Sequence, residues 1–169
     1  YNKRKHTERT DKKMQIIILI ILILVNAYFA ASEIAFISLN DTKIEKMAKE
    51  GNKKAIQIEK MLKNPSKFLA TIQIGITLAG FLSSAFASDA FASELAPMLN
   101  KIIPAISVQV WNTISIILIT IILSFFTLVF GELVPKRLAM KHYEKIAFAT
   151  IGIIRTISII TAPFVKLLS

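Results

Sequence analysis

Cysteine is absent from the 169 residues of the chain, and histidine occurs only twice. The lack of cysteine excludes disulfides, thiolate metal sites and cysteine nucleophiles, and it leaves the redox compartment open. His6 and His142 lie far apart in basic segments, so we expect neither a zinc site nor a Ser–His–Asp arrangement. The chain also lacks a glycine-rich loop that could hold a phosphate. These absences predict a protein that is not an enzyme.

Charged residues are also few, at 19% of the chain against 54% hydrophobic residues, and the mean hydropathy is +0.58. This balance is too apolar for a soluble globular domain. The net charge of +10 could indicate nucleic acid as a partner. However, the basic residues flank long apolar runs and form no exposed stripe interleaved with aromatic residues. We therefore expect membrane lipids as partners, with anionic headgroups near the basic residues, and no nucleic acid.

Three segments have the ~20-residue length that a helix needs to cross the hydrocarbon core: residues 14–37, 68–87 and 106–130. The first follows a basic tail, residues 1–13, and its apolar run exceeds the ~7–15 residues of a signal-peptide core. The third carries no charge, and Trp111 near its start is placed as an interfacial anchor would be. The sequence therefore predicts an all-α membrane protein with three transmembrane helices in residues 14–169.

The second span differs from the others in its small and polar side chains, which are Thr71, Gln73, Gly75, Thr77, Gly80, Ser83 and Ser84. Small residues allow helices to approach closely, and hydroxyl or amide groups in lipid need partners inside the protein. We therefore expect this helix to pack against an ion cavity or at a dimer interface.

An amphipathic juxtamembrane helix is predicted over residues 42–63, with opposite charges at helical spacing in Glu45–Lys49 and Glu59–Lys63. Gly51 and Asn52 could break it. Asn64 followed by Pro65 is typical of a helix start, so we expect Asn64 to cap the second span.

A second juxtamembrane helix is predicted over residues 138–168. Its apolar part, residues 146–168, is interrupted by Arg155 and Pro163. An arginine at the centre of a span costs ~2.5–3.5 kcal/mol on insertion scales. A helix lying on the membrane surface, with Arg155 reaching toward the headgroups, is therefore favoured over a fourth span.

The orientation of the spans follows from the distribution of lysine and arginine. Residues 1–13 and 88–105 carry seven of these residues, whereas residues 41–67 and the region after Gly131 carry fourteen. By the positive-inside rule the second side is cytoplasmic, although the basic tail counts against this orientation. We expect a multi-pass protein of the cell membrane with its N-terminus outside and its C-terminus in the cytoplasm.

Two acidic residues, Glu33 and Glu132, adjoin apolar helices, where a carboxylate is costly unless it is paired or bound to a cation. Gly131 permits close approach of the backbone beside Glu132. Pro135 has no amide hydrogen and leaves the carbonyl of Leu133 or Gly131 without its helical partner. Exposed carbonyls beside a carboxylate form an oxygen-rich site of the kind that magnesium prefers.

Four hydroxyl groups are candidates to complete such a site: Ser32, Thr77, Ser83 and Ser84. For any one of them, a hydrogen bond between helices or back to its own helix is a simpler role. Glu33 could equally be a hydrated residue at a helix end, and Glu132 could be one beside Lys136 or Arg137, although the neighbours of Glu132 favour a site. These alternatives stay open from the residues alone.

Three motifs occur in order along the chain: NAYFAASEIAFIS at residues 26–38, TIQIGITLAG at 71–80 and FGELVPK at 130–136. Together they resemble the membrane domain of the CorC/cyclin M (CNNM) family of magnesium transporters, over nearly the whole chain after the basic tail. The resemblance implies a homodimer of three-span protomers with juxtamembrane helices, whose central cavity holds a largely dehydrated magnesium ion.

In that family the ion is held by serines of the first and second spans, an asparagine of the second, and the glutamate and nearby carbonyls of the third motif. The resemblance thus implies Glu132, Ser84, Ser32 and the carbonyl region of Gly131 as ligands. The chain departs from the pattern at Ala30, where many members have serine, and at Gly80, where they have asparagine. A water, Thr77 or Ser83 is expected to substitute near Gly80.

The resemblance implies magnesium transport, with export and coupling to sodium entry, and cytoplasmic CBS domains in the full-length chain. The direction of transport does not follow from the residues. An alternative is a membrane anchor module that senses magnesium or binds a partner without conducting ions. A lytic pore is a third possibility, which the retained basic segments disfavour.

Overall fold

The structure is a computed structural model that describes the backbone of residues 2–168 and the side chains of residues 13–87 and 91–163. In this part of the chain every element is a helix. The order is α1 (Asn2–Ile37), α2 (Asp41–Lys49), α3 (Lys53–Leu62), α4 (Pro65–Ile102), α5 (Val108–Leu128), the π-helical turn η1 (Val129–Leu133) and α6 (Val134–Leu168). Three stretches of helix among the described residues are long and apolar enough to cross a membrane, as predicted.

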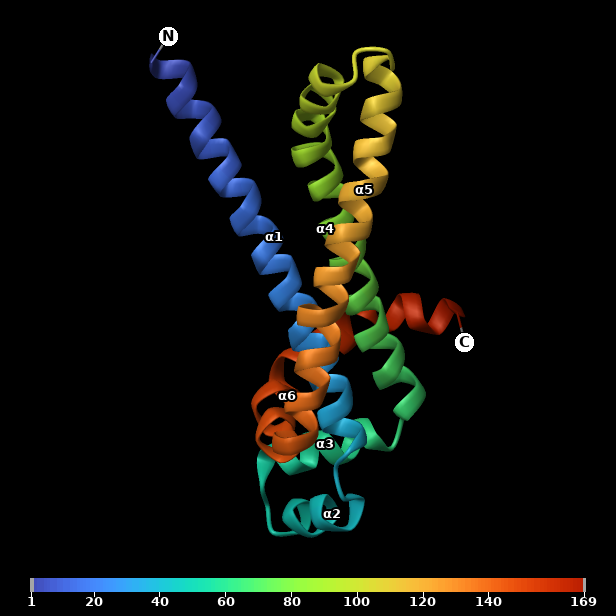
Figure 1. Ribbon diagram of the computed structural model, residues 1–169. Helices are drawn as coiled ribbons and strands as arrows, with labels where there is room; N and C mark the ends of the chain where they lie inside the picture. The colour runs from blue at the N-terminus through green and yellow to red at the C-terminus, as the bar shows by residue number, and fades with distance from the viewer. Residues whose placement is uncertain (1, 169) are drawn as a thin grey trace.

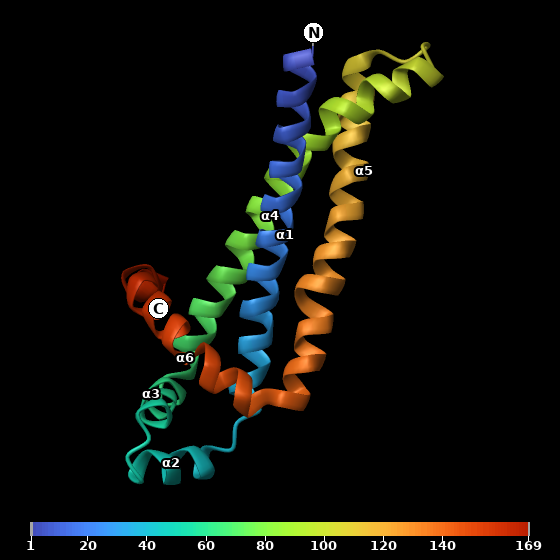
Figure 2. The same ribbon diagram turned by 90° about the vertical axis from the view of Figure 1, so that its left-hand side faces the viewer.

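Helices α4 and α5 run lengthwise beside one another, and α1 packs against α4 near the base but diverges from it toward the N-terminus (Figure 1), while the shorter α2 and α3 gather at the base with α6 (Figures 1 and 2). The N-terminal end of α1 and the connection between α4 and α5 lie at the opposite end (Figure 2). Helix α6 turns away from α5 and crosses the base of the bundle (Figure 2). Its backbone leaves helical geometry at His142, with φ −130° and ψ 30°.

Two of the long helices extend beyond the predicted spans. Helix α1 has 36 residues and α4 has 38. At ~1.5 Å per residue these lengths are about 54 and 57 Å, well above the ~30 Å hydrocarbon core. The basic tail therefore continues α1, and the predicted connection at residues 88–105 is helical as far as Ile102. Neither glycine nor proline interrupts residues 2–37, so no residue there ends the helix.

The main hydrophobic cluster lies at the base, where α1 meets the short helices. Phe36 and Phe68 pack with ring centroids 4.7 Å apart, and Ile44, Ile58 and Ile154 are buried around them. Burial of this apolar surface holds α2 and α3 against the ends of α1, α4 and α6.

Helix α2 is also fixed to α6 by an ion pair between Lys43 and Glu144. The hydrogen bond to Glu144 raises the pKa of the Lys43 ammonium.

Turn chemistry explains how the base folds. The predicted break between α2 and α3 occurs at Gly51, whose φ of +89° favours glycine. The Asn40 side chain accepts a hydrogen bond from the Lys43 amide at 3.0 Å, and Asn52 caps α3 in the same way. Helix α4 starts at Pro65 with Asn64 in the N-cap position, as predicted, but the Asn64 side chain makes no capping hydrogen bond, and its backbone lies at φ −129° and ψ 66°.

The surface of the long helices is strongly apolar. The most apolar 18 residues of the helical stretch that includes α5 have a mean hydropathy of 2.6. Only 11% of them are buried inside the protein. Ile121 and Phe125 are each 62% exposed. Such a surface is stable only against lipid or another protein. Trp111 is buried, and its Nε1 donates to the carbonyl of Ile103 at 3.2 Å, which fixes the connection between α4 and α5.

Candidate cation site

The site begins with an irregular turn at the junction of α5 and α6. Residues Val129–Leu133 form a π-helical turn, and the amide of Val134 donates to the carbonyl of Val129, five residues earlier. Proline adds to the irregularity, because Pro135 has no amide hydrogen to offer the carbonyl of Gly131, four residues earlier. The sequence FGELVP thus produces a local interruption of the helical ladder, and such turns often occur at functional sites.

Asn26 of α1 fills this interruption. Its Nδ2 donates to the carbonyl of Gly131 at 3.1 Å, across 105 residues of sequence. A Cβ on Gly131 would lie 2.9 Å from that Nδ2, so glycine is needed for the close approach. Asn26 is only 3% exposed, and its Oδ1 is buried without a hydrogen-bond partner in the described part of the chain. An unpaired buried amide oxygen is costly, so a hydrogen-bond donor or a cation beside it would be favourable.

A cavity of about 240 Å³ adjoins this contact. It lies between α1, α4, α5 and the turn η1, and Asn26, Glu132 and Ser84 each line it. The other lining residues are Ile76, Gly80, Leu123, Ser124, Thr127 and Leu128. The cavity thus combines one carboxylate, one amide and several hydroxyl groups within an apolar membrane segment.

A lysine pairs with both carboxylates at this site and offsets one of their two negative charges. Lys136 Nζ lies 2.9 Å from Glu132 Oε1 and 3.0 Å from Glu33 Oε2. The exposed fractions of the three side chains are 26% for Lys136, 34% for Glu132 and 20% for Glu33, so the group is partly shielded from water. Glu33 and Glu132 come from α1 and η1, so the ammonium joins these two elements through charged hydrogen bonds.

Among the described residues, no three His, Cys, Asp or Glu side chains are placed to hold a metal ion together. A cation bound here would therefore be held by Glu132 with neutral oxygens from amide, hydroxyl and carbonyl groups. Hard cations such as magnesium accept such mixed oxygen ligands and often retain water.

The structure brings together part of the predicted set. Gly80, Ser84 and Glu132 line the cavity, and the carbonyl of Gly131 meets Asn26 beside it. Ser32 lies elsewhere: it is fully buried, and its Oγ donates to the carbonyl of Tyr28 in its own helix at 2.7 Å. Thr77 is exposed and does not line the cavity.

Asn26 was not among the predicted ligands. The sequence did contain one indication of its role, because the Asn26 amide lies within the apolar run of residues 16–31, where a polar group needs a partner inside the protein. Ser83, the other candidate near Gly80, is buried without a hydrogen-bond partner in the described region, but it is not one of the lining residues.

Comparison with known protein families gives a match between residues 17–169 and the cyclin M transmembrane N-terminal domain, CNNM. The chain belongs to this family. The match covers all the elements of the site and confirms the resemblance drawn from the three motifs. The CNNM family is one of membrane proteins of the transporter type.

Curated relatives agree with this CNNM assignment. A UPF0053 protein of Synechocystis sp. is 36% identical over 156 residues, which are 92% of this chain and 34% of the relative. The UPF0053 inner membrane protein YfjD of Escherichia coli is 30% identical over 86% of this chain and 30% of its own length. The polyamine export protein of Haemophilus influenzae is 27% identical over 89% of the chain and 34% of its length.

The CNNM domain thus spans about a third of the length of these relatives. Three apolar helices together with an inner membrane relative place the chain among multi-pass membrane proteins.

Proposed function

We propose that this domain binds magnesium in the cavity beside η1 and carries it across the membrane as a homodimer. The observation that supports the proposal best is that Glu132 and Asn26, whose Oδ1 is unpaired, line the same cavity. The carboxylate would offset part of the charge of the ion. Asn26, the Ser84 hydroxyl and the carbonyl of Gly131 would supply neutral oxygens.

Lys136 supplies the charge balance when the cargo is absent. Its ammonium lies between Glu33 and Glu132, where it prevents two carboxylates from standing unpaired near lipid. A magnesium ion that binds Glu132 competes with this ammonium, which keeps Glu33 as its partner. The exchange lets the carboxylates be paired with and without cargo, which lowers the electrostatic cost of ion release.

Substitution of Glu132 by glutamine tests the site. Glu132→Gln keeps the volume of the side chain and removes one negative charge, so we expect magnesium affinity to fall by at least about tenfold, or ~1.4 kcal/mol. Isothermal titration calorimetry on the purified protein measures it. Glu50→Gln, at the exposed C-terminal end of α2, removes the same charge away from the cavity and should leave the affinity unchanged. Near-equal affinities in Glu132→Gln and the unaltered protein, with the helical circular dichroism retained, would remove Glu132 from the site.

Export of magnesium in exchange for sodium is the form of transport that the family resemblance implies, and we include it in the proposal. Flux into and out of liposomes that contain only this protein, with a sodium gradient of either sign, measures direction and coupling. Binding without flux would favour a magnesium-sensing or partner-binding module instead.

A second candidate cargo is an organic polyamine. The observation that favours it is the Lys136 ammonium, a primary alkylammonium held by two carboxylates at 2.9 and 3.0 Å. One relative is named a polyamine export protein. Calorimetry with spermidine beside magnesium separates the two cargoes, because a polyamine site should bind spermidine more tightly and magnesium should compete only weakly.

A further inference from the structure

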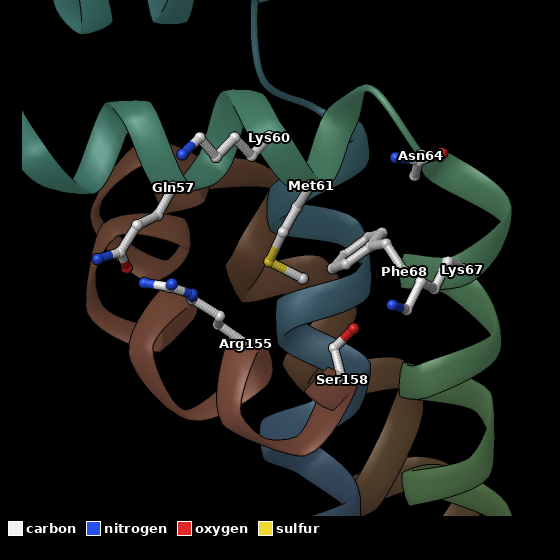
Figure 3. A pocket seen from close by; sticks show the side chains of 8 residues that line it. All are labelled: Gln57, Lys60, Met61, Asn64, Lys67, Phe68, Arg155 and Ser158. Carbon is white, nitrogen blue, oxygen red and sulfur yellow. The ribbon is translucent and has the colours of Figure 1, made fainter. Parts of the chain in front are cut away.

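A second pocket, of about 170 Å³, lies between α3, the start of α4 and α6, at the base of the bundle (Figure 3). Eight side chains line it: Gln57, Lys60, Met61, Asn64, Lys67, Phe68, Arg155 and Ser158. None of these is acidic, and three are cations from three different helices. The pocket therefore has the charge of an anion site.

The polar groups of the pocket form two sets, Lys67 with Ser158 on one side and Arg155 with Gln57 on the other (Figure 3). In Figure 3, the Lys67 ammonium and the Ser158 hydroxyl point toward one another, while the Arg155 side chain extends toward Gln57. Guanidinium, ammonium, hydroxyl and amide groups are the donors that bind phosphate oxygens, and the guanidinium can do so with two hydrogen bonds. The pocket also lies at the first turn of α4, where free backbone amides favour an anion.

Carboxylates of α2 and α3 pair with lysines that lie outside the pocket. Glu59 pairs with Lys63 at 2.7 Å, and Glu45 pairs with Lys49 at 2.8 Å. These ion pairs leave the cations of the pocket available to another anion. Arg155 interrupts an apolar stretch of α6, so its charge has a cost at the membrane face that a bound anion would offset.

The surroundings of the pocket favour a lipid over a soluble anion. Its floor includes the buried Phe68 and the partly buried Met61. Ile159 and Ile160, which follow Ser158 on α6, are 64% and 65% exposed. Leu69, which follows Phe68 on α4, is also exposed. A polar pocket next to exposed apolar side chains at the membrane face suits a phosphate headgroup with acyl chains attached.

We propose that this pocket, lined by Lys60, Lys67, Arg155 and Ser158, binds the phosphate of an anionic phospholipid headgroup through Lys67 and Ser158, while Arg155 and Lys60 add positive charge. Such a lipid joins α3, α4 and α6 at the base of the bundle. It is independent of the cation cavity and of the cargo, since the two pockets share no lining residue.

Native mass spectrometry of the detergent-purified protein, titrated with phosphatidylglycerol, phosphatidylcholine or inorganic phosphate, tests the proposal. We expect phosphatidylglycerol to bind at least about tenfold more tightly than phosphatidylcholine. The double variant Lys67→Gln/Arg155→Gln should lose this preference. The control Lys46→Gln/Lys141→Gln removes the same charge at exposed positions outside the pocket and should retain it.

Three results would overturn the proposal: equal affinity for the two lipids, an equal loss of preference in the control variant, or displacement of phosphatidylglycerol by an equimolar concentration of inorganic phosphate. The first two indicate general attraction of the basic protein to anionic lipid, and the third indicates a free phosphate as the ligand. Circular dichroism and melting temperature check the fold of each variant. If the double variant does not fold, Lys67→Gln alone serves with Lys46→Gln as its control.

Discussion

Asn26 has two roles in the structure, because its amide group holds the carbonyl of Gly131 while its Oδ1 stays free for a ligand. We expect Asn26→Ala to lower the free energy of unfolding by ~1–3 kcal/mol, since the carbonyl of Gly131 loses its buried donor. Magnesium affinity should fall as well. Thermal unfolding and calorimetry measure the two effects, and Asn112→Ala on the exposed face of α5 is the matched control. Unchanged magnesium affinity in a folded Asn26→Ala protein would show that its oxygen is not a ligand.

Substitution of Lys136 at the same site should have the opposite effect on magnesium affinity. Lys136→Met removes the ammonium that competes for Glu132, so we expect magnesium to bind about tenfold or more tightly, a gain of ~1.4 kcal/mol. The fold should become less stable without magnesium, because Glu33 and Glu132 then lack a counter-ion. Arg137→Met, at the exposed neighbouring position, should change neither quantity. Weaker magnesium binding in Lys136→Met would contradict the competition.

At the level of elements, the close packing of α1 against α4 depends on Gly75, which the sequence analysis noted only as one of several small residues. A Cβ at Gly75 would lie 2.6 Å from the ring of Phe29, whereas a Cβ at Gly80 would meet nothing within 4 Å. We expect Gly75→Ala to cost ~1–3 kcal/mol through overpacking. Gly80→Ala should be neutral or slightly stabilising, because alanine is favoured over glycine in helices. Melting temperatures of the two variants test this expectation. Equal melting temperatures would show that α1 and α4 are not tightly packed at Gly75.

Some helix boundaries could be predicted from the sequence and others could not. Periodicity and capping residues were sufficient for the break at Gly51 and for the three apolar spans, because these depend on local backbone preferences and on the length of the hydrocarbon core. They were insufficient for the ends of α1 and α4, because α1 continues through its basic tail and α4 continues through Pro97 to Ile102. The partner of the Gly131 carbonyl was also beyond reach, since it lies 105 residues away.

At the scale of the whole molecule, α2, α3 and α6 share one end with most of the basic residues (Figure 1). We predict that this end faces the cytoplasm, by the positive-inside rule. The chain has no cysteine, so a single cysteine in place of exposed Lys53 can be labelled without background. An impermeant maleimide added outside intact cells should not react with it, whereas it should react after the membrane is permeabilised. Reaction in intact cells would reverse the orientation.

The sequence by itself determined that the protein is a helical membrane domain with three spans and that Glu132 stands in an irregular turn. It could do so because apolar length, proline and glycine act locally. Only the tertiary structure decided which polar groups share the cavity. It placed Asn26 there and left Ser32 bonded within its own helix. It also set Lys136 between two carboxylates and brought Lys67 and Arg155 into one pocket. These choices depend on how helices far apart in sequence cross, and no local pattern encodes a crossing.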